Sequence, residues 1–202
     1  MFVVDSRAVT VRSSIMANKE HIQPLIDALA SQSMVSWNQL RLENPSIRPD
    51  LLGVELADAN LSFANLSYAD ISHANLSRTN LHHANLRHAD LSSTNLQKAD
   101  LSEADLSDSI LNGADLSGAI LRDAKLCKAN LIGASLKDVN LKGVDLEGVL
   151  IEPEAIEKRK IRSSKGVSYL EKLALGILAP LKRKDHFRVN RGAKTHRSDK
   201  HV

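Results

Sequence analysis

The histidines are the side chains of this 202-residue sequence with the clearest capacity for chemistry, because imidazole nitrogens are common ligands of zinc and related metals. Four of the eight histidines lie close together, at His73, His82, His83 and His88. A zinc site needs several converging ligands with polar partners behind them, and the adjacent His82 and His83 have no obvious acidic companion. We therefore expect solvent-exposed histidines and assign no metal and no cofactor.

Cys127 is the only cysteine, which excludes a disulfide framework. It lies between Lys125 and Lys128, and positive charges nearby lower the pKa of a thiol. A cysteine nucleophile also needs a base, and no histidine or second cysteine can be assigned to that role, so we interpret Cys127 as an incidental thiol. The sequence also lacks a phosphate-binding glycine loop, a nucleophile elbow and an HExxH motif, and we do not expect an enzyme.

A five-residue period determines where these side chains are placed. From Leu56 to Ile151 every fifth residue, twenty in succession, is leucine, except for Ile71 and Ile151. A helix would repeat its apolar residues every 3.6 positions and a strand every 2, so a strict period of five predicts a short strand followed by a corner. Repetition of this unit winds the chain into a solenoid with a leucine column along its axis. The middle of the column is the predicted structural core: Leu76, Leu81, Leu86, Leu91, Leu96, Leu101 and Leu106.

The other positions of the unit support this arrangement. Two residues before the central position, thirteen of the twenty units have alanine, and fourteen have Asn or Asp between the two. Since residues two apart in an extended segment share a face, Ala and Leu point inward while Asn or Asp points outward. The last two residues are mostly polar or glycine, which suits a solvent-facing turn. Three exceptions to alanine lie fifteen residues apart, which would fit three units per coil and leaves the number of sides open: Thr79, Thr94 and Ser109.

The tandem pattern Ala-(Asp/Asn)-Leu-X-X, as at residues 64–68 and 84–88, resembles the pentapeptide-repeat family. This resemblance implies an all-β solenoid, a right-handed quadrilateral β-helix with four units per coil, and therefore about five coils over residues 49–152. His73 and His83 would then lie on opposite sides, with His88 on a neighbouring side. The pattern departs from the family at its end, and we expect a widened or imperfect last coil where the small inward residue becomes Val139, Val144 and Val149.

Residues 1–48 are predicted to be an extension followed by a short helical cap, because an open solenoid end exposes apolar side chains and unpaired backbone groups. Apolar residues at helical spacing support the cap: Ile22, Leu25, Ile26 and Leu29, then Val35, Trp37, Leu40 and Leu42. The segment from residue 37 to 51 also resembles a leader found before the repeats in bacterial, notably cyanobacterial, members of the family. Such leaders begin close to a Met-Ala pair, so a start at Met1 or at Met16 stays open.

After the repeats, residues 153–181 are predicted to contain a linker and a helix with one apolar stripe over residues 166–181. A second cap is the favoured interpretation, and a helix lying on a membrane surface is the alternative. Residues 182–202 hold eight basic and two acidic residues without periodicity, which is typical of a disordered tail. Its basic residues are candidates for weak contact with nucleic acid or anionic membranes, foremost Lys182, Arg183, Lys184, Arg188 and Arg191.

The net charge of +3 conceals an uneven distribution, because residues 49–152 carry fifteen acidic and eight basic side chains while residues 153–202 carry five and fourteen. With no catalytic motif and no signal for export, we expect a cytoplasmic, non-enzymatic scaffold that presents the faces of a rigid rod to an unidentified protein partner. The family resemblance supplies an alternative, a DNA-mimicking inhibitor of type II topoisomerases such as gyrase. Nonspecific binding through the basic tail ranks third, and dimerisation is left open.

Overall fold

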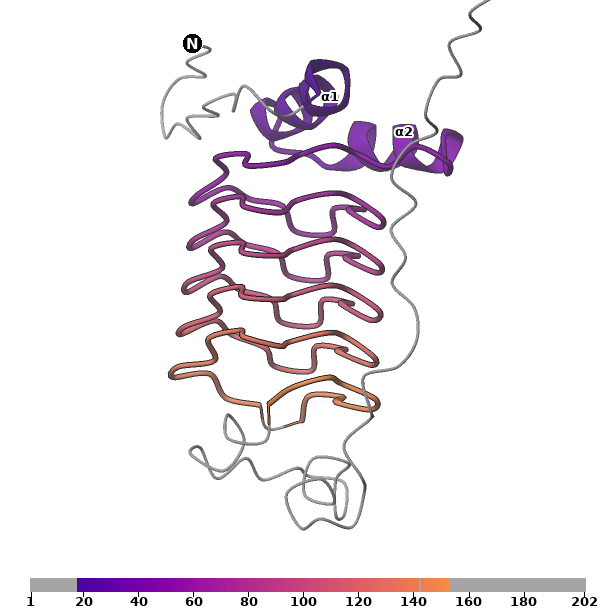
Figure 1. The fold of residues 1–202 in the computed structure, drawn as a ribbon. Coiled ribbons are helices and arrows are strands. Elements are labelled where there is room, and N and C mark those ends of the chain that lie inside the picture. The colour runs from indigo at the N-terminus through magenta and orange to yellow at the C-terminus, as the bar shows by residue number, and fades with distance from the viewer. Residues whose placement is uncertain (1–17, 142, 153–202) are drawn as a thin grey trace, which may run out of the picture.

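The computed structural model describes residues 18–141 and 143–152. Two helices, α1 (Lys19–Ala30) and α2 (Val35–Glu43), precede a stack of similar coils (Figure 1). Neither of these helices is long and apolar enough to cross a membrane. The helix predicted over residues 166–181 and the basic tail lie outside the described residues, as does the extension before residue 18.

The coils are held together by parallel β-bridges between residues twenty positions apart. Asp50 is bridged to Asp70 and Asp70 to Asp90, and the series continues to the pair of Asn130 and Leu150. Twenty residues are four units of five, so each coil has four sides and the spacing of fifteen does not define the coil. Within the described residues the bridged positions are isolated and form no longer strand. The short strand expected in each unit is therefore reduced to one bridged residue, because the corner takes up the rest.

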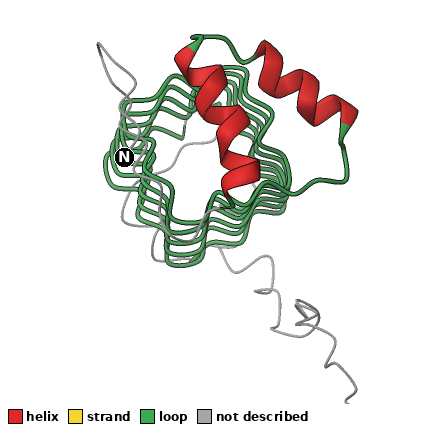
Figure 2. Ribbon diagram, turned by 90° about the horizontal axis from the view of Figure 1, so that it is seen from above, coloured by secondary structure: helices red, strands yellow, loops and turns green. Residues whose placement is uncertain are grey.

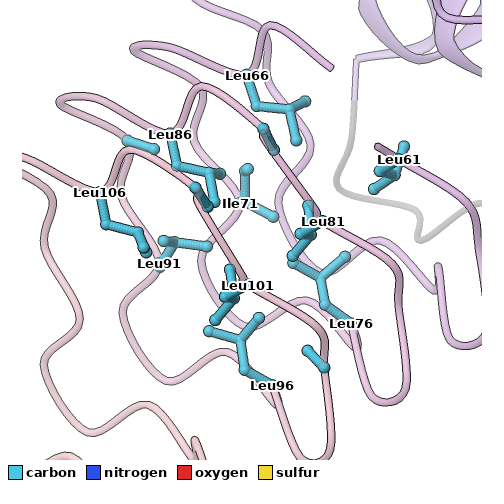
Figure 3. Close-up of a cluster of buried hydrophobic side chains, with 14 of the residues drawn as sticks. Leu61, Leu66, Ile71, Leu76, Leu81, Leu86, Leu91, Leu96, Leu101 and Leu106 are labelled. Atoms are coloured by element: carbon cyan, nitrogen blue, oxygen red, sulfur yellow. The ribbon is translucent and has the colours of Figure 1, made fainter. Parts of the chain in front are cut away.

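The interior of the stack is filled by two side chains from each unit, the central leucine and the small residue two positions before it (Figure 3). The leucines in the middle of the column are 0% exposed: Leu76, Leu81, Leu86, Leu91, Leu96, Leu101 and Leu106. Burial of one leucine side chain contributes about 1.5–3 kcal/mol, so the column is the main favourable term in folding. Exposure of the central leucine rises slightly toward Leu146, and Val139 and Val144 are only partly buried in the last coil.

In most units the Asn or Asp that precedes the leucine fixes the corner. Asp70 Oδ1 accepts a hydrogen bond of 3.0 Å from the backbone N–H of Ser72, and Asp90 Oδ1 accepts one of 2.9 Å from Ser92. The following residue adopts a left-handed backbone, as His83 does with a φ of 55°, and its N–H reaches the next coil. Asn and Asp suit the position before the leucine because a short side-chain acceptor closes this turn.

The inward hydroxyl residues are also satisfied. Thr79 Oγ1 donates a hydrogen bond of 2.8 Å to the carbonyl of Leu56, and Thr94 Oγ1 donates one of 2.9 Å to Ile71. Ser109 uses a backbone carbonyl in the same way. A small hydroxyl side chain therefore replaces alanine without leaving an unpaired polar group in the core.

The two helices lie over the N-terminal end of the stack. Figure 2 shows α1 crossing the end of the coils, with α2 beside it toward one edge. Trp37 is buried, and its Nε1 donates a hydrogen bond of 2.9 Å to the carbonyl of Asn65 in the first coil. The buried guanidinium of Arg41 donates to the carbonyls of Ile47 and Ser67 at 2.6 and 2.9 Å. These contacts tie α2 to the backbone of the solenoid.

Not all of the apolar residues that supported the cap contact the coils. Trp37 is buried, whereas Val35 and Leu42 are 75% and 73% exposed. They are seven residues apart and share the outer face of α2, whereas Trp37 and Arg41, four residues apart, share the inner face. Apolar character alone therefore does not show which side of α2 meets the coils, and the inner side includes the buried Arg41.

Replacement of Leu96 by lysine tests the inward assignment. Leu96 is fully buried, so Leu96→Lys places a charge where no partner exists and should reduce stability by several kcal/mol. Thermal unfolding followed by circular dichroism measures the effect. Gln97→Lys adds the same side chain at the adjacent exposed position and should melt close to the parent, whereas equal melting of Leu96→Lys and the parent would contradict the assignment.

Truncation tests the role of the helices. Removal of residues 1–15 should leave melting and solubility unchanged, because the apolar contacts begin at Ile22. Removal of residues 1–44 exposes the first coil and should cause association through its uncovered end. Sedimentation velocity compares the two proteins, and identical behaviour would show that α1 and α2 do not protect this end.

Candidate interaction surface

The outer surface of the solenoid is organised in columns, because residues twenty apart occupy the same corner of successive coils. In two columns this register stacks an aromatic ring on a histidine. The rings of Phe63 and His83 are 5.0 Å apart with an interplanar angle of 21°, and those of Tyr68 and His88 are 4.6 Å apart at 17°. Phe63 and Tyr68 are nevertheless 61% and 43% exposed. We call the two stacked pairs, together with His82, the aromatic–histidine surface.

This surface lies next to α2 and shares hydrogen bonds with it. The Asn38 side-chain amide donates a hydrogen bond of 2.9 Å to the carbonyl of Phe63, and its Oδ1 accepts one of 2.8 Å from the N–H of Asn65. The guanidinium of Arg48 lies 5.6 Å from the centre of the Tyr68 ring, within range of a cation–π interaction. The corners that present the aromatic rings are therefore held by α2 and Arg48 on one side and by the next coil on the other.

The histidines form one arrangement that their neighbours in the sequence do not reveal. His82 and His83 have ring centroids 4.2 Å apart, and His83 Nε2 lies 3.3 Å from Glu103 Oε2. The expectation of no acidic companion was therefore wrong, because Glu103 follows His83 by twenty residues and occupies the same corner of the next coil. By the same register His73 lies two sides away from His83 and His88 one side away, as expected from four units per coil.

The environment of Cys127 also differs from the prediction. Burial raises the pKa of its thiol, and the carboxylates of Asp145 and Glu147 raise it further, which outweighs the opposing effect of Lys128. Glu147 follows Cys127 by twenty residues, so the next coil supplies acidic neighbours that the local sequence does not show. The nearby lysines therefore do not activate this thiol.

Basic side chains interrupt the acidic surface of the rod. Arg78 Nε donates a hydrogen bond of 2.6 Å to Asp58 Oδ1, and the Arg87 guanidinium lies 3.4 Å from Asp105 and 3.6 Å from Asp108. These arginines pair with carboxylates of neighbouring coils. Although residues 49–152 carry a net charge of −7, these acidic groups are locally neutralised.

The described residues line two depressions outside the core. A cavity of about 230 Å³ lies between α1, α2 and the segment of residues 44–49, and Trp37 and Arg41 line it. An open groove of about 660 Å³ runs down the side of the stack, lined by Arg48, Tyr68, Ala69, Asp70, His88, Asp90, Asp108, Ile110 and Lys128. The groove mixes aromatic, acidic and basic groups, which favours a protein surface over an apolar small molecule as its occupant.

The repeated unit also matches a known protein family in sequence. The family model for pentapeptide repeats matches eight copies, over residues 55–92, 74–113, 84–123 and 109–148. Four-sided coils of five-residue units and this match define a repeat protein of the β-solenoid class. The chain belongs to the pentapeptide-repeat family, and membership implies a right-handed quadrilateral β-helix. No curated protein gives a significant match.

Solved structures of the same family are similar in sequence. A pentapeptide-repeat protein from the cyanobacterium Cyanothece 51142 is 30% identical over 64% of this chain and 95% of its own, with a TM-score of 0.42. One from Nostoc PCC 7120 is 31% identical over 63% and 94%, with a TM-score of 0.22. A protein of the Arabidopsis thaliana thylakoid lumen is 24% identical over 63% and 87%, with a TM-score of 0.46.

Acid titration tests how the carboxylates contribute to stability. A hydrogen bond from Ser117 lowers the pKa of Asp115, and this effect, helped by Gln97, outweighs partial burial. A carboxylate with a lowered folded-state pKa stabilises the fold above its unfolded value of about 3.9, and this stability is lost as pH falls through the folded-state pKa. Asp115→Asn keeps an acceptor for the turn but removes the titrating group.

The free energy of unfolding of Asp115→Asn should therefore fall less between pH 6 and pH 2 than that of the parent. Urea unfolding at each pH measures the difference. Asp123→Asn, which removes a carboxylate from an exposed corner, is the matched control. An unchanged pH dependence in Asp115→Asn would mean that this carboxylate does not favour the folded state.

Proposed function

We propose that this protein is a non-enzymatic scaffold, a rod of about five coils that α1 and α2 cap and that binds a protein partner through the aromatic–histidine surface. The exposure of Phe63 and Tyr68 on a rigid backbone carries this proposal. Aromatic side chains are enriched among the residues that dominate protein–protein binding energy, and a rigid surface loses little conformational entropy on binding. The scaffold acts in the cytoplasm.

The arrangement of the core argues against catalysis at the axis. Over residues 49–141 and 143–152, two inward side chains from each unit fill the interior, which leaves no room at the axis of these coils for a water-excluded cavity around a reacting group. The polar residues instead lie on the corners and faces, where a partner has access to them. Binding is the activity that such a surface supports.

A set of variants tests the surface. In an affinity pull-down from native lysate, Phe63→Ala/Tyr68→Ala should lose a partner that the parent retains, because it removes both exposed rings while leaving the core intact. Ile132→Ala is the matched control, since Ile132 is also 43% exposed but lies on another corner. Thermal melting should be unchanged in all three proteins. Equal capture of every partner by the double variant and the control would contradict the proposed surface.

Removal of residues 182–202 separates the scaffold from the basic tail, whose candidate residues Lys182, Arg183, Lys184, Arg188 and Arg191 lie outside the described residues. Binding of the protein partner should be unchanged by this truncation. Binding to DNA or to anionic vesicles should disappear with it, and in the intact chain that binding should weaken steeply with added salt through counterion release. Sequence-selective, salt-resistant DNA binding would contradict a nonspecific tail.

DNA mimicry remains the alternative, and the pairing of Arg78 and Arg87 with neighbouring carboxylates makes the rod a poor imitation of a phosphate backbone. A supercoiling assay with purified gyrase and the protein without residues 182–202 distinguishes the two functions. We expect no inhibition at near-stoichiometric protein. Inhibition of gyrase would contradict the scaffold proposal and favour a topoisomerase inhibitor.

A further inference from the structure

We propose that His82, His83 and Glu103 form a binding site for a divalent transition metal ion of the zinc class. One ligand atom from each residue can be chosen such that all three lie within 4.8 Å of one another. Two imidazoles and one carboxylate are a donor set that suits Zn²⁺, and the exposed position leaves the remaining coordination to water or to a side chain of a bound partner.

The separation of the best-placed ligand atoms fits a shared ion. His83 Nε2 and Glu103 Oε2 are 3.3 Å apart. Two ligands at about 2.0–2.1 Å from a tetrahedral zinc are separated by roughly 3.3 Å, so this pair needs little rearrangement. His82 is on the adjacent residue of the same corner, and its ring approaches by side-chain rotation, since it is only partly buried.

The surroundings restrict how far the ligands can move. The Phe63 ring stacks on His83 at 5.0 Å and meets the edge of His82 at 6.1 Å, so it lies against both imidazoles. The backbone N–H of His83 is bonded to the carbonyl of Ser102 at 3.0 Å, which fixes the corner that bears both histidines to the coil that bears Glu103. A backbone held in this way preorganises the site.

The charge of the site also suits a cation. Glu103 contributes a carboxylate directly. A divalent ion would connect two successive coils, since the histidines and Glu103 belong to neighbouring turns.

Zinc titration of the full chain, stripped of metal with a chelator, tests the site. Competition with a chromogenic chelator should show one Zn²⁺ for each chain, and Co²⁺ should give visible absorption typical of a low-coordinate site. His83→Ala and Glu103→Gln should each weaken binding by at least tenfold. Zn²⁺ should also raise the melting temperature of the parent, because the ion binds the folded protein across two coils, and it should not raise that of His83→Ala.

His73→Ala is the matched control, because His73 is an exposed corner histidine with a similar φ of 58° that lies on the opposite side of the coil. It should bind Zn²⁺ as the parent does. Full retention of binding by His82→Ala/His83→Ala would place the ion elsewhere on the chain and overturn the proposal, as would the absence of any binding at millimolar Zn²⁺. Melting of the variants without metal should equal that of the parent, which excludes misfolding as the cause of lost binding.

Discussion

The burial of two side chains from every five residues is the constraint on which the rest of this structure depends. The central leucine and the small residue before it must both point toward the axis, and this leaves three positions to close a corner and face solvent. Parallel bridges then join each unit to the one twenty residues later. The stability of the stack is therefore local and repeated, since each unit contacts mainly its neighbours along the chain and in the adjacent coils.

Because of this constraint, the residues that stabilise the fold are different from those that face solvent. Corner residues such as Phe63, His83 and Arg78 contribute little to the buried interior, so their identity is free to serve binding. Their relative positions are nevertheless well defined, because the backbone N–H of each of these three residues is bonded to a carbonyl of the next coil. Such a rod presents mixed chemistry on a nearly rigid surface, in contrast to loops that become ordered only on binding.

The period of five was sufficient to predict the solenoid and the inward leucines, because hydrophobic spacing reports directly on which side chains are buried. The period alone did not determine the number of sides, since Thr79, Thr94 and Ser109 occupy inward positions for reasons of size and hydrogen bonding rather than of coil geometry. The exposure of Val35 and Leu42 could not be predicted, because apolar character does not show which face of a short helix meets a neighbour. The pairing of His83 with Glu103 and the acidic surroundings of Cys127 required the twenty-residue register, which only the coil geometry supplies.

A coil of four equal units has a consequence for how such a protein can change over generations. Loss or gain of one complete five-residue unit would keep the leucine column continuous, yet it would turn every later corner by a quarter of a revolution relative to the earlier ones. If the change fell between them, Glu103 would no longer lie beneath His83, although both residues and the core would be preserved. Duplication or deletion of a five-residue unit during evolution can therefore create new combinations of surface groups. Each resulting protein still folds, because the leucine column stays continuous.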